Sequence, residues 1–446
     1  MMSRGLSMII VSLVLLAVPQ DLFARQGEQS KPPEEVVTEQ VTHFSAGRIV
    51  TLEEVARAAH PGPLLPLRIL SYPFRLVTSG IEKGLISFEK HRLRERFSLW
   101  RERLADWGVT PLIGGLGEGT GFGGGVLYTL RPNDRDTLQA RARASFQGYQ
   151  ELDLQWTRPT PRGRFVFEGS RQWRPRENFY GLGPDSQRAQ RSRFALRQSW
   201  VGLSWEGSLT ERSKFGLGHK QTWLSALEGR DSRFPSPDRF FEGLPGLNQS
   251  LRLRQTALYW ETNLTGGEYK RGARVLLGAS YQSAMGESKV RYFTYQAHLE
   301  GRLPVARERS ALVGWLDLAL NRERGGSDPL PFYVQPHLGG SSTLRGFPLD
   351  RFYGKNALLA TLEYRYKIHP NIQAILFFDQ GQVFNRSAEL RWRNWHRSYG
   401  LGIKFKTSAG TVFGIEYGQS REGFQIHITF GDRPSRSLGG LLRHGG

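Results

Sequence analysis

The sequence predicts an all-β fold: a sixteen-stranded antiparallel transmembrane β-barrel of the outer-membrane type, preceded by a short helical N-terminal extension. Three observations lead to this prediction. The chain opens with an export signal, no later stretch holds the roughly 18 consecutive apolar residues of a membrane-spanning helix, and from Val109 onward apolar and polar residues alternate with a period of two. Barrel strands hide their apolar character from window averages, so a hydrophobic fraction of 39% and a mean hydropathy of -0.44 fit a membrane protein.

Residues 1–24 are predicted to be a secretory signal peptide. Arg4 supplies the positive start, Leu6 to Ala17 form the apolar run, and Leu22-Phe-Ala24 provides the cleavage site. The apolar run is shorter than the roughly 20 residues that a spanning helix needs, so we expect export rather than a helical anchor. The absence of cysteine in an exported chain excludes a disulfide framework and every thiolate metal site.

Residues 25–107 are predicted to be a periplasmic extension. Its first part, 25–45, is polar and rich in Pro and Glu, which is typical of a flexible segment. An amphipathic helix is predicted further along, where apolar residues recur every three or four positions opposite charged ones. These residues are Phe74, Val77, Ile81, Leu85 and Phe88. Four placements fit such a helix: on the membrane face, as a cap on the barrel, in the lumen, or packed within the extension.

Residues 108–431 are predicted to form the barrel, and 432–446 a C-terminal tail. In one strand, for example, Leu362 and Tyr364 alternate with Glu363 and Arg365, so that one face is apolar and the other charged. Strands are predicted at 109–117, 121–131, 137–147, 149–160, 163–173, 194–206, 213–224, 253–264, 272–282, 292–304, 311–321, 357–368, 374–384, 399–407, 411–418 and 424–431. Their number is even, as it is in single-chain bacterial barrels.

A soluble β-sandwich would show the same alternation, with its apolar face turned inward. Two observations favour lipid on the outside. The polar faces carry frequent full charges, and aromatic residues lie near strand ends, as in interfacial girdles; these are Trp156, Tyr364, Tyr366 and Phe430. Long loops at 174–193, 225–252 and 324–356 follow odd-numbered strands, whereas short turns follow even ones. This asymmetry is typical of outer-membrane barrels.

The net charge of +20 predicts anionic partners. Residues 26–105 hold 12 basic and 10 acidic side chains, so the excess of positive charge lies in the barrel region. Outer-membrane lipid headgroups and lipopolysaccharide phosphates are the expected partners. Nucleic acid is not expected, because the chain carries an export signal and lacks a recognition-helix or basic-helix pattern.

The 324–356 loop carries the most informative motif, Thr343-Leu-Arg345-Gly346-Phe347. A strand some 30 residues later reads Phe377-Phe-Asp379-Gln-Gly381. If the loop folds into the lumen, the Arg345 guanidinium and the Asp379 carboxylate are natural bidentate partners. The pair Gly339-Gly340 lets the loop turn sharply. Loops of this length are rarely without function.

In these motifs and in its alternating strands the chain resembles the BamA/TamA-type outer-membrane assembly factors, the bacterial surface antigen family. In that family an Arg-Gly-Phe/Tyr loop tip binds acidic residues of the strands that follow. The resemblance therefore implies a lid-loop lock made by Arg345, Gly346 and Phe347 with Glu363, Asp379 and Gly381. Family members usually carry periplasmic POTRA modules, and residues 26–105 show too few strands for one. This departure bears on how a client would be received.

The first and last strands are expected to meet at a weak seam. The first strand lacks one backbone N–H donor, because of Pro111, and packs few side chains, because of Gly114, Gly115 and Gly117. A weak closing pair is what a lateral gate toward lipid requires, because broken hydrogen bonds find no replacement there. Irregular terminal strands are the plainer interpretation. The family's last strand ends the chain at an aromatic residue; Phe430 matches it, although 16 residues follow here.

No enzyme, cofactor or metal site is predicted. Residues 119–124 match GxGxxG, but strand patterns surround them and no helix follows, which indicates a glycine-rich hairpin. No HExxH or Gly-x-Ser-x-Gly motif occurs, and His427 is expected to face the lumen. The resemblance implies outer-membrane biogenesis: insertion or translocation of unfolded outer-membrane or secreted client proteins, or lipid transport, through a gated barrel with a resident lid. The alternative is a passive pore for small anionic solutes; nothing specific favours a receptor or scaffold.

Overall fold

The computed structural model describes Leu104 and residues 106–430, with gaps at 230, 307–308, 327, 392–394 and 408–409. The predicted signal peptide, the amphipathic helix and the tail at 432–446 lie outside the described residues, so these remain predictions. Within the described part of the chain, no helix has the length and apolarity that a membrane span requires.

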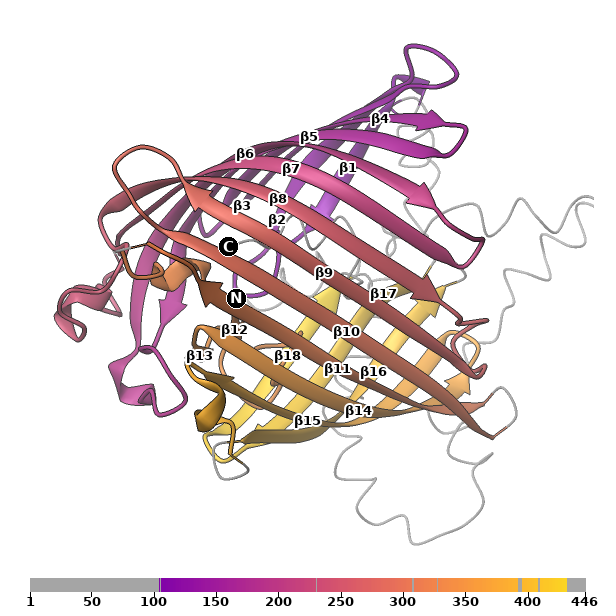
Figure 1. The fold of residues 1–446 in the computed structure, drawn as a ribbon. Coiled ribbons are helices and arrows are strands. Elements are labelled where there is room, and N and C mark those ends of the chain that lie inside the picture. Colours follow the sequence, from indigo (N-terminus) through magenta and orange to yellow (C-terminus); the bar gives the residue numbers. More distant parts are fainter. Residues whose placement is uncertain are drawn as a thin grey trace, which may run out of the picture. The chain divides into compact units, whose positions relative to one another are not determined.

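Sixteen long strands form one antiparallel sheet, in chain order, that curls into a barrel (Figure 1). These strands are β1 (Val109–Gly114), β2 (Gly123–Leu130), β3 (Thr137–Ser145), β4 (Gln150–Thr160), β5 (Gly163–Phe179), β6 (Ser192–Ser208), β7 (Ser213–Glu228), β8 (Gln249–Asn263), β9 (Gly272–Ala284), β10 (Arg291–Ala306), β11 (Ser310–Glu323), β14 (Asn356–His369), β15 (Ile372–Phe384), β16 (His396–Thr407), β17 (Gly410–Ser420) and β18 (Gly423–Phe430). The prediction of an all-β, sixteen-stranded antiparallel barrel is confirmed.

The connections hold short elements of their own. They contain the 3-10 helices η1 (Arg188–Gln190), η2 (Pro237–Arg239), η3 (Phe332–Val334) and η4 (Ser387–Glu389), and a two-stranded sheet of β12 (His337–Leu338) and β13 (Phe352–Tyr353). The longer connections gather at one end of the barrel, which we call the long-loop end. In outer-membrane barrels such loops are extracellular and the short turns are periplasmic.

Strand boundaries differ from the predicted ones mainly at the long-loop end. β5 continues to Phe179 and β7 to Glu228, past the predicted ends at 173 and 224. These extensions remain paired with β6. The first strand was predicted too long. It ends at Gly114, so Gly115 and Gly117 lie in the connection to β2. The backbone N–H groups of Leu116 and Gly117 there donate to Thr120 Oγ1, which satisfies them within a turn instead of a ladder.

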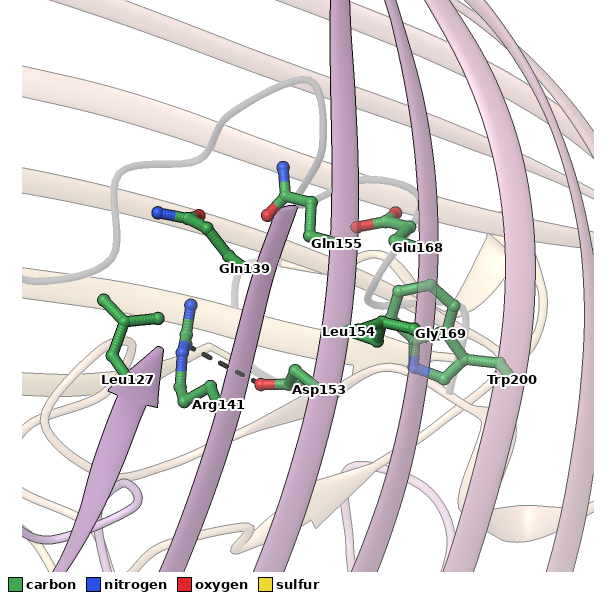
Figure 2. Close-up of a pocket in the computed structure, with 9 residues that line it drawn as sticks. All are labelled: Leu127, Gln139, Arg141, Asp153, Leu154, Gln155, Glu168, Gly169 and Trp200. Carbon is green, nitrogen blue, oxygen red and sulfur yellow. Dashed lines mark ion pairs between the residues drawn. The ribbon is translucent and has the colours of Figure 1, made fainter. Parts of the chain in front are cut away.

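Apolar side chains face outward and polar ones face the lumen. On β14, Leu362 is 50% exposed whereas its neighbour Glu363 is fully buried. Figure 2 shows part of the inner wall, where five polar side chains from β3, β4 and β5 surround a small hollow: Gln139, Arg141, Asp153, Gln155 and Glu168. Arg141 and Asp153 form an ion pair at 3.7 Å. This is the polarity of a barrel that faces lipid outside.

The 324–355 segment between β11 and β14, which we call the lid loop, packs against the barrel through two apolar clusters. The first joins η3 to β5–β8 and β10, with Phe332 between Phe179 and Phe194 at 4.8 Å between ring centroids. The second holds Leu344, Phe347 and Phe352 against Leu359 and Val383 of β14 and β15. Figure 1 places β12 and β13 beside these strands.

β1 and β18 are the two edges of the sheet, and we call the region between them the seam. Among the described residues, no backbone ladder joins them. The sequence predicted a weak seam with sparse pairing, and between these two described strands no ladder forms at all. β1 has only 6 residues, Pro111 has no N–H to donate, and Gly114, with φ +130°, turns the chain away from the strand.

Candidate functional site

The tip of the lid loop is shaped by glycine and by one hydroxyl. Gly339 and Gly340 have φ of 124° and 92°, a region that side chains other than glycine rarely adopt. The Thr343 hydroxyl accepts from Gly339 N at 2.7 Å and donates to Gly339 O at 3.0 Å. The turn thereby presents Arg345 to the lumen wall.

Arg345 is fully buried and carries the central contact of the site. Its Nε and Nη2 donate to the two oxygens of Asp379 on β15, at 2.9 and 2.6 Å, and its backbone N–H donates to Asp379 Oδ2 at 3.1 Å. Nη1 donates to Glu363 Oε1 on β14 at 2.6 Å. A bidentate fork of this kind fixes both distance and orientation. Thus the structure brings together the three charged residues singled out in the sequence.

The surroundings neutralise and orient this cluster. Glu416 on β17, which the sequence interpretation missed, lies 3.7 Å from Arg345 Nη1. Lys404 pairs with Glu416 at 3.6 Å and Arg365 with Glu363 at 2.8 Å, so three cations face three carboxylates. Such matching is needed, because an unpaired buried charge costs several kcal/mol. In addition, the Arg345 guanidinium stacks on the Phe377 ring, 3.4 Å from its centroid.

Gly346 lets the tip approach the wall at backbone distance. A Cβ on Gly346 would lie 2.6 Å from the Gln419 carbonyl, and one on Gly418 of β17 would lie 2.4 Å from Arg345 O. The Ser420 hydroxyl donates to Gly346 O at 2.7 Å. Phe347 fills the apolar cluster beside Phe352, and a Cβ on Gly381 would meet Leu338 at 3.0 Å.

The lid tip also contacts both sides of the seam. On β18, His427 Nε2 lies 2.7 Å from Arg345 O, and its Nδ1 lies 2.9 Å from Glu118 Oε1. Glu118 belongs to the β1–β2 connection, and its Oε2 accepts from Ser341 N at 2.5 Å and from Ser341 Oγ at 2.7 Å. Burial raises the pKa of the Glu118 carboxyl, but the hydrogen bonds from His427 and Ser341 outweigh it and bring the pKa below its usual value. These contacts join the seam edges where no ladder does.

The predicted seam residues make none of these contacts, although Gly117 directly precedes Glu118. Pro111 and Gly114 lie on β1, paired with Val126 and Gly123 of β2. Gly115 and Gly117 lie in the β1–β2 connection, on either side of Leu116. Phe430 ends β18, is 45% exposed and packs on Phe413 at 5.5 Å.

A second guanidinium, Arg351, holds the lid loop at the long-loop end. It forms a fork with Glu422 in the β17–β18 turn, with two contacts of 2.9 Å, and donates to Ser186 in the β5–β6 loop. It also stacks over Phe352 at 4.5 Å. The lid loop is therefore bound to loops on both sides of the seam.

At the short-turn end, the β8–β9 turn reaches strands that are not its neighbours in the sheet. Glu268 pairs with Lys406 of β16 and, at 3.6 Å, with Arg365 of β14, while Tyr269 Oη accepts from Gln373 of β15 at 2.6 Å. Arg365 thus contacts both Glu268 and Glu363, the partner of Arg345. A continuous set of ion pairs runs from the lid tip to this turn.

Sequence signals existed for only some of the missed residues. Glu416 lies at an inward position of a predicted strand, so alternation could have identified it as a lumen side chain, as it did His427. Glu118, Ser341 and Glu268 sit in connections, where no periodicity predicts which way a side chain points. In the described part of the chain, no group of three His, Cys, Asp or Glu side chains gathers as metal ligands would.

Several solved structures have a fold similar to that of this chain. In solved structures, the chain is similar to BamA from Haemophilus ducreyi lacking POTRA domains 1-3, with a TM-score of 0.54 and 13% identity over 73% of this chain and 70% of that one. CdiB from Escherichia coli matches with a TM-score of 0.48 and 15% identity, over 72% of this chain and 62% of that one. CdiB from Acinetobacter baumannii matches with a TM-score of 0.47 and 11% identity, over 72% of this chain and 58% of that one. A comparison with curated proteins found no match.

Likeness at such identities concerns the fold. The family follows from a different comparison: the Omp85 superfamily domain matches residues 136–419, well over half of the chain, from the start of β3 to the end of β17. The predicted resemblance to outer-membrane assembly-factor barrels is thereby confirmed, and with it the predicted location. The chain belongs to the Omp85 superfamily and is an outer-membrane β-barrel protein of a diderm bacterium.

Proposed function

We propose that this protein inserts or translocates polypeptides at the outer membrane, and that the seam between β1 and β18 is where the client meets the barrel. Membership of the Omp85 superfamily supports a role in outer-membrane protein biogenesis, since BamA has a similar fold. The partners are unfolded outer-membrane or secreted clients and the surrounding lipid. No cofactor or catalytic step is needed.

One observation carries the proposal: the lid tip holds both seam edges while the edges themselves lack a ladder. Strand edges with free backbone groups pair readily with another strand. Here Arg345 O is bonded to His427 of β18, and Ser341 to Glu118 next to β1. Withdrawal of the lid would remove both contacts at once. An incoming client strand could then pair with the free edge.

A passive pore for anions would need lumen arginines that are free to bind the solute, but several of them are paired with carboxylates of the protein. Arg345, Arg351 and Arg365 are all ion-paired, and the lid loop and the β8–β9 turn hold them in place. This favours a gated barrel over an open pore. Stable high conductance of the resting protein, with no effect on client folding, would instead support the pore.

The test uses a covalent bridge across the seam. Ile113→Cys and Phe424→Cys place thiols on exposed, outward positions near the long-loop ends of β1 and β18. The protein is reconstituted in liposomes, bridged with a thiol-cleavable bismaleimide, and given a urea-unfolded eight-stranded barrel as client. We expect bridging to abolish the accelerated appearance of folded, heat-modifiable client. Cleavage of the bridge should restore it.

The matched control bridges two paired strands. Ala279 of β9 and Tyr295 of β10 face each other directly in the ladder, so Ala279→Cys with Tyr295→Cys introduces the same chemistry without touching the seam. This variant should stay active when bridged. Full client folding by the seam-bridged protein would contradict the proposal.

A further inference from the structure

The outer wall carries a group of arginines that the lid lock and the seam do not use. Arg171, Arg197, Arg252, Arg254 and Arg291 lie on β5, β6, β8 and β10, and all five are exposed. They alternate with buried residues such as Ser170, Leu253 and Gln255, so they face outward from the barrel. Nothing in the proposed handling of clients requires them.

Strand register places these arginines in three adjacent rows near the long-loop end. One row runs Trp173, Arg197, Ser225 and Ser250; the next runs Arg171, Ser199, Trp223 and Arg252; the third runs Gly169, Val201, Gln221, Arg254, Ser283 and Arg291. The rows contain five cations, two tryptophans, four serines and no acidic residue. We call this surface the arginine patch.

The guanidinium groups of the patch are not neutralised by the protein. None of the five has a carboxylate partner among the described residues. Arg197 stacks over Trp173 at 5.3 Å, and Arg254 Nε donates to Met285 Sδ at 3.2 Å, contacts that orient the side chains without cancelling their charge. The inner-wall arginines, by contrast, are largely ion-paired, as Arg143 is with Glu151.

The patch borders directly on the lipid-facing band. Toward the short-turn end, the same outward faces continue with Phe167, Leu203 and Leu258, which are 40%, 50% and 59% exposed. The opposite wall is less cationic near the long-loop end: the outward residues of β14, β15, β16 and β17 there are Leu358, Gln380, Arg397 and Gln419. The five arginines of the patch therefore gather on one side of the barrel, away from the seam, whereas the opposite wall carries the single Arg397 among these positions.

We propose that the arginine patch binds a phosphorylated, multiply acylated sugar lipid of the outer leaflet, of the lipid A type. Its phosphates would meet the arginines, its sugar hydroxyls the serines, and its acyl chains the apolar band below. Arginine matches phosphate because its planar fork donates two parallel hydrogen bonds, and tryptophan suits the boundary between headgroup and acyl chains. This proposal rests on the outer-membrane location and the orientation of the barrel, and it is independent of the proposed handling of clients.

The test measures lipid retention by the purified full-length protein. Wild-type protein in detergent is titrated with bis-phosphorylated lipid A, with the same lipid after removal of both phosphates, and with phosphatidylglycerol; bound lipid is quantified by mass spectrometry. We expect the protein to retain bis-phosphorylated lipid A strongly and the other two lipids only weakly. Equal retention of the dephosphorylated lipid, or of phosphatidylglycerol, would overturn the assignment, and this comparison needs no mutant.

Variants then locate the site. Arg197→Gln, Arg252→Gln and Arg254→Gln together should weaken lipid A binding roughly 100-fold, since each basic residue near an anionic headgroup contributes about a factor of five. The control, Arg162→Gln, Arg212→Gln and Arg271→Gln, removes the same charge from exposed turns at the other end and should leave binding unchanged. Equal losses in both variants would mean a non-specific charge effect. Client folding is measured separately, so failure of one proposal leaves the other standing.

Discussion

The buried charges around Arg345 stabilise the lid loop only as a set. Asp379 alone accepts three hydrogen bonds from Arg345 and one each from the hydroxyls of Thr361 and Ser398, both at 3.1 Å. Removal of one partner leaves the others desolvated without compensation, which is far more costly than removal of both. The energetic role of the cluster is therefore visible in the coupling between residues and not in any single substitution.

Arg345→Ala and Asp379→Ala should each lower the free energy of unfolding by about 3–5 kcal/mol. The double variant should lose much less than the sum, because each single change strands the partner that the other removes. Urea-induced unfolding in phospholipid vesicles, followed by tryptophan fluorescence, measures all four corners of the cycle. Additive losses would mean that the two residues are not energetically coupled.

Asp350 makes the lid loop sensitive to pH. Burial raises the pKa of its carboxyl to about 6, although His337, 3.2 Å away, acts in the opposite direction. The unfolded chain ionises near pH 4, so the folded state retains a proton that the unfolded state has lost. Stability therefore falls as pH rises from about 4 to about 6, and the full penalty is present above that.

Asp350→Asn removes this penalty without straining the backbone. Residue 350 has φ +58°, a conformation that asparagine tolerates. We expect the lid loop of the variant to be more stable than that of the wild type by up to roughly 2–3 kcal/mol at pH 8, with no gain at pH 4. Hydrogen exchange of peptides from 336–355 at both pH values measures the difference. Parallel exchange profiles for the two proteins would refute the role of Asp350.

At the scale of elements, the lid tip and β17 meet where neither has a side chain. Gly418→Ala would place a Cβ 2.4 Å from Arg345 O, so the tip must withdraw from the wall. We expect faster trypsin cleavage within the lid loop while the barrel itself stays heat-modifiable on gels. Gly301→Ala on β10 is the matched control, because no atom lies within 4 Å of its Cβ position. Equal cleavage in both variants would show that this contact does not hold the lid.

The strands and the central residues of the lid site were predictable from the sequence. The contacts made by the connections between strands were not. Alternation predicted that Glu363, Asp379 and His427 face inward, because a strand fixes the direction of every second side chain. No such rule applies to Glu118 or Glu268, whose positions depend on how the β1–β2 and β8–β9 connections fold across the lumen. How far the first and last strands pair could not be predicted for a related reason. A predicted strand says nothing of whether its edge finds a partner, and Gly114 ended β1 earlier than the glycine-rich pattern suggested.

In the whole molecule, two segments enter the barrel from opposite ends. The lid loop occupies the long-loop end through Arg345 and Arg351, and the β8–β9 turn crosses to β14–β16 through Glu268 and Tyr269. Two constrictions in series both limit ion flow, because their resistances add and either one, while closed, keeps the conductance low. Opening either segment alone should therefore change the conductance little.

Planar-bilayer recordings can separate the two constrictions. Wild-type protein, Asp379→Ala and Glu268→Ala should each show low single-channel conductance, whereas the double variant should conduct several times more than either single one. Glu261→Ala combined with Asp379→Ala serves as the control, since Glu261 is an inward carboxylate that pairs with Arg274 on the neighbouring strand, not across the lumen. If Asp379→Ala alone gave the full conductance, the lid loop would be the sole barrier. The contacts of Glu268 would then stabilise the wall without closing the channel.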